Sequence, residues 1–386
     1  MSRMQIGYTI STSFRIRNSE KMYNMNSNKL ISYEVLKSSE TRNYNIHLLS
    51  FTKITSEEYH LFKNEDVQIN LNIFREGNIL FSLNLQIKET NVVEELNGKY
   101  NLQLVLVSDY IKKLMNSTKY VEMTGTSDNK DILSAYELVT KVIRQMSKDG
   151  GEAVKGYYNN AGEIKFAYPN ITVPKNLNDL ILFDYLFEHY PPYYLKPYFI
   201  IDDFHAINKK NNKSSYHIFL NNIIDTNGNY FLKNVKTIST YKLENYKYIK
   251  TRQLFNFEDF KKELQSTIYL KNTNAKKIFK LQPLKESMRI DNVIIDESQL
   301  SVKFYKAKLR FKKILMNYNS SIESYSFKNA DIFDYTFGNV YNIQSKEFDM
   351  LPINIFYRFT KNDQDENFTL LTKVDFVKSP SNLLAN

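Results

Sequence analysis

The sequence predicts an α+β protein in which most of the chain forms antiparallel β-sheet and a helical region is inserted between strands. Residues 67–107 contain three consecutive segments that alternate apolar and polar side chains, as strands with one buried face do. Apolar residues at helical spacing follow over 109–115 and 131–146. A hairpin pattern at 353–377 places further β-structure near the end of the chain.

Residues 1–66 are expected to add several short strands to the same sheet. Alternation is visible at 14–16 and at 44–48, and polar Asn/Ser stretches such as 24–29 separate these segments.

The three strands of residues 67–107 form a predicted meander with one wet face. Turns are expected at Glu76-Gly77-Asn78 and near Asn97-Gly98. The polar faces carry mainly Asn, Gln and Ser, which suit a surface exposed to water or to another subunit, whereas a catalytic face would carry convergent titratable groups. The apolar positions are Val67, Ile69, Leu71, Ile73, Phe81, Leu83, Leu85, Ile87, Tyr100, Leu102, Leu104 and Leu106.

The predicted sheet passes directly into helices. Ser108 is placed to cap a short helix, and Asp128 is placed to cap a longer one. Residues 177–190 are apolar nearly all round, which predicts a helix buried between layers. A fully apolar strand at 198–201 then runs into Asp202-Asp203.

The second half of the chain carries weaker patterns. The loop at 208–215 is the candidate return from the helical insertion to the sheet. Residues 216–288 show mixed short strands and a helix around 257–264, and 302–314 are strand-like.

Length and composition bound the class of protein. A chain of 386 residues is long enough for two to four domains. It has no cysteine, which excludes disulfides, thiolate metal sites and cysteine nucleophiles. Residues 1–17 lack the apolar run of a signal peptide, and no window is apolar enough to span a membrane, so we expect a soluble protein that does not use the usual secretory route.

The formal net charge of +10 would ordinarily favour a polyanion partner. Lysine is nevertheless enriched together with Asn, Ile and Tyr, as in proteins from AT-rich genomes, so the charge is discounted as evidence.

The candidate catalytic residues are few. No G-x-x-x-x-G-K-[ST], G-x-G-x-x-G or G-x-S-x-G string occurs, and no cofactor is expected. The densest group is Asp202-Asp203-Phe204-His205, which could bind a metal or do acid/base chemistry, but carboxylates after a strand are also ordinary turn residues, and that interpretation is favoured. The five histidines lack the i, i+4 pairing of a helical zinc site: His47, His60, His189, His205 and His217.

A basic strand face is the candidate contact for a polyanion. Its cations, which alternate with apolar and aromatic residues, are Lys306, Lys308, Arg310 and Lys312. Cations and rings together suit a nucleic-acid groove. The favoured alternative is a solvated edge strand, because lysine on an edge prevents unwanted pairing.

The order of elements resembles that of the central baseplate hub proteins of contractile-tailed bacteriophages and related injection machines. The segments that carry the resemblance are the meander at 67–107, the join Leu106-Val107-Ser108-Asp109-Tyr110, the helix at 131–146, Asn170-Ile171-Thr172-Val173-Pro174, the helix at 177–190, the strand at 198–201 and the hairpin at 353–377.

This resemblance implies two tube-like β-barrel domains with a helical insertion. The first barrel would be residues 1–107, completed by about 197–235, the insertion 108–196 and the second barrel 236–386. It further implies a homotrimeric ring in the virion baseplate that connects a sixfold tail tube to a threefold spike. The implied partners are further copies of the chain, the tail tube or tube-initiator protein, the central spike and the wedge proteins, with DNA only as transiting cargo.

Three functions therefore stay open. The first is the structural hub, which is not an enzyme and has no stable membrane insertion. The second is a nucleic-acid-binding protein of a phage or mobile element that uses the Lys306–Lys312 face. The third and least favoured is a metal-dependent hydrolase centred on Asp202, Asp203 and His205.

Overall fold

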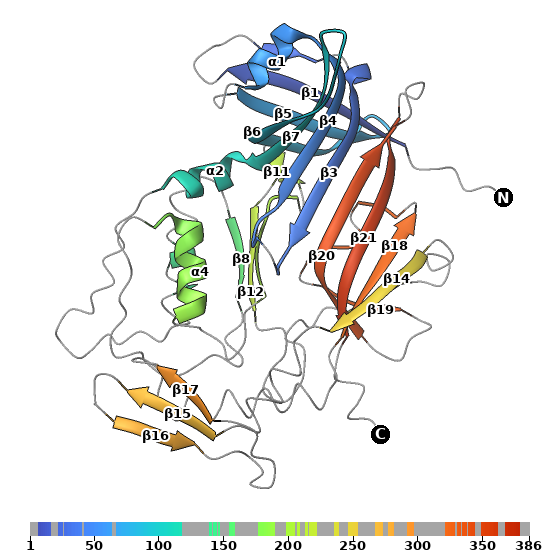
Figure 1. Ribbon diagram of the computed structural model, residues 1–386. Helices are drawn as coiled ribbons and strands as arrows, with labels where there is room; N and C mark the ends of the chain where they lie inside the picture. The colour runs from blue at the N-terminus through green and yellow to red at the C-terminus, as the bar shows by residue number, and fades with distance from the viewer. Residues whose placement is uncertain are drawn as a thin grey trace.

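The structure is a computed structural model, and the parts of the chain that it describes are mainly antiparallel β with few helices (Figure 1). The described residues are 7–16, 22–25, 27–40, 42–63, 67–117, 139–140, 142–144, 146, 154–158, 177–189, 198–204, 207–208, 213–214, 216–221, 235–238, 246–253, 267–272, 277–281, 292–296, 321–328, 330–332, 334–337, 339–343, 349–361 and 367–378. No described helix has the length and apolar character needed to cross a membrane.

One sheet of thirteen strands dominates the molecule. Its main path runs β14-β18-β21-β20-β3-β4-β7-β6-β5-β1-β2, and β13 and β19 join it through β20. In order along the chain, these strands are β1 (Tyr8–Ile16), β2 (Met22–Asn24), β3 (Leu30–Ser38), β4 (Ile46–Ile54), β5 (Val67–Arg75), β6 (Asn78–Leu96), β7 (Lys99–Ser108), β13 (Val235–Ile238), β14 (Tyr246–Gln253), β18 (Ser321–Lys328), β19 (Val340–Ile343), β20 (Asp349–Thr360) and β21 (Thr369–Lys378).

The predicted meander is confirmed as β5, β6 and β7, which pair antiparallel in sequence order. Gly77 and Gly98 occupy its two turns with φ of 78° and 71°, a backbone region that glycine adopts without steric cost. Glu76 and Asn97, which precede them, are also left-handed, with φ of 49° and 50°. Two consecutive left-handed residues give the turn whose twist matches that of the flanking strands.

Strands from the two ends of the chain lie side by side in this sheet. β20 pairs antiparallel with β3, with Tyr357 opposite Val35, and β21 pairs with β20 in the hairpin that the sequence predicts at 353–377. An isolated bridge joins Tyr8 to Phe368, with N–O distances of 3.0 and 2.7 Å. In Figure 1 the red β20 and β21 accordingly stand beside the blue β3. Among the described residues, the strand order runs from β14 at one end to β2 at the other and does not close into a barrel. The two tube-like barrels therefore stay a prediction.

A second hydrophobic core lies under the helical segment. It joins α2 (Asp109–Asn116) and α4 (Asp179–His189) to the three-stranded sheet of β8 (Val154–Tyr158), β12 (Tyr216–Asn221) and β9 (Tyr198–Asp202). Ser108 caps α2 as predicted, because its hydroxyl oxygen accepts a hydrogen bond from the Ile111 amide at 3.4 Å.

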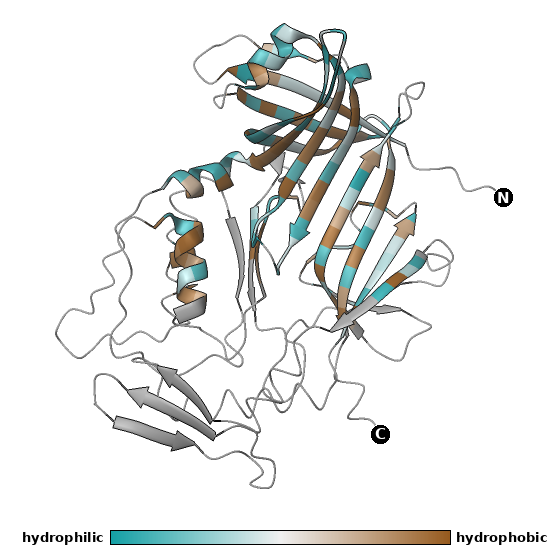
Figure 2. Ribbon diagram, in the orientation of Figure 1, coloured by the Kyte–Doolittle hydropathy of each residue, from teal (hydrophilic) through white to brown (hydrophobic). Residues whose placement is uncertain are grey.

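The helix predicted at 177–190 is confirmed as α4, but the prediction that it is buried between layers holds for one of its faces only. In α4, Leu182, Phe183 and Leu186 are buried, but Ile181 is 51% exposed and Asp184 is exposed. The apolar run therefore extends around a helix that packs through one face. In the main sheet, Figure 2 shows apolar and polar positions alternating along the strands.

The remaining described elements are short. They are η1 (Ser27–Lys29), α1 (Ser56–Phe62), β10 (Ile207–Asn208), β11 (Lys213–Ser214), β15 (Thr267–Asn272), β16 (Lys277–Leu281) and β17 (Asn292–Asp296). The helix expected around 257–264 and the strand expected at 302–314 lie outside the described residues, and of the helix expected at 131–146 only residues between 139 and 146 are described.

A buried polar cluster as the candidate functional site

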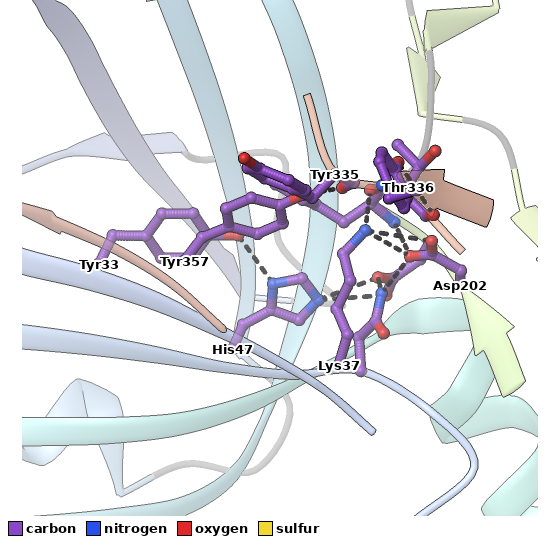
Figure 3. Close-up of polar contacts among 11 residues, drawn as sticks. Tyr33, Lys37, His47, Asp202, Tyr335, Thr336 and Tyr357 are labelled. Carbon is purple, nitrogen blue, oxygen red and sulfur yellow. Dashed lines mark hydrogen bonds and ion pairs between the residues drawn. The ribbon is translucent and has the colours of Figure 1, made fainter. Parts of the chain in front are cut away.

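The most concentrated polar chemistry among the described residues is buried where β9 meets the main sheet (Figure 3). β3 contributes Lys37, the segment before β4 contributes Asn45, and β4 contributes His47. The end of β9 contributes Asp202 and the next residue is Asp203. We call these five residues the buried polar cluster.

Backbone contacts bring the end of β9 to this position. The Ile201 amide donates to the Asn43 carbonyl oxygen at 2.7 Å, and Ile201 forms a parallel bridge with Tyr44. On β3, the alternation of the strand sends Tyr33, Val35 and Lys37 inward, while Leu36 between them is 40% exposed.

Lys37 and Asp202 form an ion pair without solvent contact. Lys37 Nζ lies 3.0 Å from the Asp202 carboxylate, and both side chains are 0% exposed. The same amine donates to the Phe204 carbonyl oxygen and lies 5.2 Å from the Phe204 ring centroid and 5.4 Å from that of Tyr357. Burial lowers the pKa of the Lys37 amine, and the negative charges of Asp202 and Asp203 oppose that shift.

The two carboxylates share one amide donor. Asn45 Nδ2 lies 2.7 Å from Asp202 Oδ1 and 2.6 Å from Asp203 Oδ1. The backbone amide of Phe204 also donates to Asp202 Oδ1, at 3.0 Å. Buried carboxylates need such donors because they have lost their hydration.

His47 connects Asp203 to the aromatic core. Its Nε2 lies 3.2 Å from both Asp203 oxygens, and its Nδ1 lies 2.8 Å from the Tyr33 hydroxyl. When the neutral ring donates through Nε2, Nδ1 is free to accept the hydrogen bond of Tyr33. The cluster therefore continues as one hydrogen-bonded chain from Lys37 to Tyr33.

Aromatic rings seal the cluster from water. The Phe204 ring stacks on Phe81 with centroids 4.1 Å apart and rings 11° from parallel. It also lies 5.6 Å from the Tyr357 ring and 6.4 Å from the Tyr33 ring. Phe204 is 2% exposed, so the segment after β9 is fixed by a ring inserted into the core of the main sheet.

The tyrosines of this core make the fold sensitive to alkaline pH. Burial, with the Asp331 carboxylate, raises the pKa of Tyr8 to about 12, and burial raises the pKa values of Tyr33 and Tyr357 well above the usual range. The unfolded chain releases these protons near pH 10, whereas the folded chain retains them. The contribution of these tyrosines to the free energy of unfolding is therefore fully present below pH 10 and is lost as the pH rises.

We therefore expect the urea midpoint of unfolding to fall steeply above pH 10. Tyr8 alone accounts for about 1.4 kcal/mol per pH unit between pH 10 and its folded-state pKa of about 12. Urea titrations at pH 8, 10 and 11, followed by circular dichroism, measure this loss. Tyr8→Phe should flatten the profile, and equal midpoints at pH 8 and pH 11 would contradict the expectation.

The sequence candidates fall partly within this site. The structure brings Asp202 and Asp203 together, and their partners are Lys37, Asn45 and His47. His205, the third residue of the predicted group, lies outside the described residues. Among the described residues, no group of three or more His, Asp or Glu is arranged to hold a metal ion. The basic strand residues Lys306, Lys308, Arg310 and Lys312 also lie outside the described residues, so their role stays a prediction.

Sequence reasoning missed Lys37, Asn45 and Tyr33. The one available signal was the register of β3, in which Lys37 follows Tyr33 and Val35 at intervals of two and so belongs on the inward face.

No protein-family model and no curated protein matches this chain. The structural comparison finds similar folds among phage tail proteins and components of injection machines. The matches span nearly the whole chain.

Three of these solved structures illustrate the similarity. The 43 kDa tail protein of prophage MuSo2 from Shewanella oneidensis is 11% identical, with 97% of this chain and 99% of that chain covered and a TM-score of 0.49. The tail protein from Neisseria meningitidis MC58 is 9% identical, with 96% of each chain covered and a TM-score of 0.49.

The third is the E. coli c3393 protein, described as a type VI secretion component with structural similarity to the T4 bacteriophage tail proteins gp27 and gp5. It is 11% identical, with 95% of this chain and 76% of that chain covered and a TM-score of 0.47. At these identities the likeness is one of fold.

Proposed function

We propose that the protein is a structural component of a tail baseplate, the central hub of a contractile-tailed phage or a related injection machine, and that it acts through protein interfaces without catalysis. The observation that carries the proposal is the sheet shared by the two ends of the chain. β20 and β21 lie beside β3, while α2 and α4 belong to a segment inserted between β7 and β9. This order of β-structure, helical insertion, return strand and further β-structure is the hub layout that the sequence resembles.

On this proposal the chain has two tube-like barrels. Residues 1–107, completed by about 197–235, form the first, residues 108–196 form the helical insertion, and residues 236–386 form the second. Three copies then supply six similar modules, which adapt a sixfold tail tube to a threefold spike. The baseplate of the virion is the expected location, and the tube or tube-initiator protein, the spike and the wedge proteins are the expected neighbours.

A ring of identical subunits needs two different surfaces on each subunit, because the contact repeats head to tail. The two ends of the main sheet provide candidates. On β2, Met22 is 55% exposed, and on β14, Tyr248 and Ile249 are 46% and 44% exposed. Exposed apolar side chains near unpaired strand edges are typical of surfaces that meet another chain.

The mass of the purified protein in solution tests this proposal. We expect light scattering to give about three times the chain mass of 45.7 kDa at both low and high salt. Substituting Ile249 with Lys should reduce the trimer at a fixed concentration, and substituting the exposed Ile181 of α4 with Lys is the matched control, since it lies outside the two sheet ends.

A monomer at both salt concentrations would contradict a hub that trimerises without its spike. If that monomer also binds duplex DNA in a salt-dependent manner, and loses binding when Lys306, Lys308, Arg310 and Lys312 are neutralised, the nucleic-acid function replaces the hub. Divalent-metal binding that Asp203→Asn abolishes would instead favour the hydrolase.

A further inference from the structure

The buried polar cluster contains the groups needed to form a covalent bond within the chain. We infer that the Nζ of Lys37 becomes joined to the Cγ of Asp202 by an isopeptide amide bond, formed in the folded protein without an external enzyme. The inference rests on the cluster alone and is independent of the proposed function.

Proximity is the first requirement, and the geometry meets it. Lys37 Nζ lies 3.0 Å from the Asp202 carboxylate, and its hydrogen bond runs to Oδ2. β3 and the end of β9 hold the two groups on rigid backbone, which gives the pair a high effective concentration. Both side chains are 0% exposed, so bulk water is kept from the reacting atoms.

A neutral amine is the second requirement, because an ammonium ion has no lone pair for attack. Burial lowers the pKa of Lys37, whose side chain is 0% exposed and has the ring centroids of Phe204 and Tyr357 at 5.2 and 5.4 Å from its amine. Desolvated lysines are the ones that proteins use as nucleophiles.

Polarisation of the carbonyl is the third requirement. Asp202 Oδ1 accepts from Asn45 Nδ2 at 2.7 Å and from the Phe204 amide at 3.0 Å. These two donors can stabilise the negative charge that develops on this oxygen when the amine attacks Cγ. The other oxygen, Oδ2, accepts a hydrogen bond from the amine, and we assign it as the leaving group.

The reaction is balanced without any further reactant. One proton of the Lys37 ammonium first moves to a neighbouring carboxylate, and the neutral amine then attacks Cγ of Asp202. The N–C bond forms, one C–O bond breaks, and Oδ2 leaves as water with that proton and a second amine proton. Asp203 shares the Asn45 donor with Asp202, and we assign its carboxylate the role of taking up this proton and returning it to Oδ2.

Intact mass spectrometry of the purified, folded chain tests the inference. We expect a mass one water, about 18 Da, below that of the linear chain, and a branched peptide after proteolysis that contains Lys37 and Asp202. The chain carries its own control, because Lys113 and Asp109 are 2.9 Å apart but 47% and 19% exposed, and we expect no bond between them.

Variants separate the amide from other losses of water. Lys37→Arg should retain the full linear mass. Asp202→Asn should release ammonia in place of water when the bond forms, and so should reach the same final mass as the unsubstituted chain. Asp203→Asn should leave a larger fraction of the molecules without the bond, at the full linear mass. A cooperatively folded, unsubstituted chain with the full linear mass and separate Lys37 and Asp202 peptides would overturn the inference.

Discussion

Replacing Lys37 with Met lowers the free energy of unfolding by about 3–5 kcal/mol. The substitution leaves the Asp202 carboxylate buried without the Lys37 cation, while the donors from Asn45 and the Phe204 amide remain. A buried charge that loses its partner retains most of its desolvation penalty. Urea unfolding of the unsubstituted protein and of Lys37→Met at neutral pH measures the difference in their free energies of unfolding.

An exposed pair and a double substitution serve as controls. Lys113→Met removes the cation of a surface pair with Asp109, and we expect a loss of at most about 1 kcal/mol. Lys37→Met combined with Asp202→Asn removes both buried charges, so the part of the loss that comes from the unpaired carboxylate should return, while the part that comes from the missing Lys37–Asp202 amide should remain. If the single and double variants lose equal stability, the buried charge is not the cause, and the loss of the covalent link explains the effect.

Replacing Phe204 with Ala lowers the free energy of unfolding by about 3–5 kcal/mol. The ring is 2% exposed and packs on Phe81, Tyr33 and Tyr357, so its removal leaves a cavity that the rigid strands cannot close. Because this ring anchors the segment after β9, hydrogen exchange at the Ile201 amide should also become faster.

Tyr248→Ala is the matched aromatic control. Its ring is 46% exposed and contacts Tyr325 at 5.7 Å between centroids, so we expect a loss of about 1 kcal/mol or less. A loss below 1 kcal/mol for Phe204→Ala, with unchanged exchange at Ile201, would show that other contacts hold β9 on the main sheet.

Features of the sheet that depend on neighbouring residues could be predicted from the sequence. The strands of the meander follow from apolar alternation, and its turns follow from Gly77 and Gly98, which take up left-handed backbone. The hairpin of β20 and β21 was also visible, since both strands alternate around a short polar segment.

Features that depend on distant residues could not be predicted. Lys37 contacts Asp202, which is 165 residues away in the chain, and no local pattern links the two. A lysine between Leu36 and Ser38 reads as a solvent-facing residue, yet Leu36 is 40% exposed and Lys37 is buried. The register of β3 turns Lys37 inward, and the ion pair with Asp202 and its donors offset the loss of hydration.

The pairing of β3 with β20 also sets the order in which the chain can fold during synthesis. β3 is complete at Ser38, but its neighbour on one side ends at Thr360. At about 5–20 residues per second, a ribosome needs tens of seconds to make the intervening chain. Throughout that interval β3 presents a row of unpaired backbone groups, which other nascent chains could join. The protein thus completes its central sheet only when β20 has left the ribosome, and until then the exposed edge of β3 is open to pairing between copies.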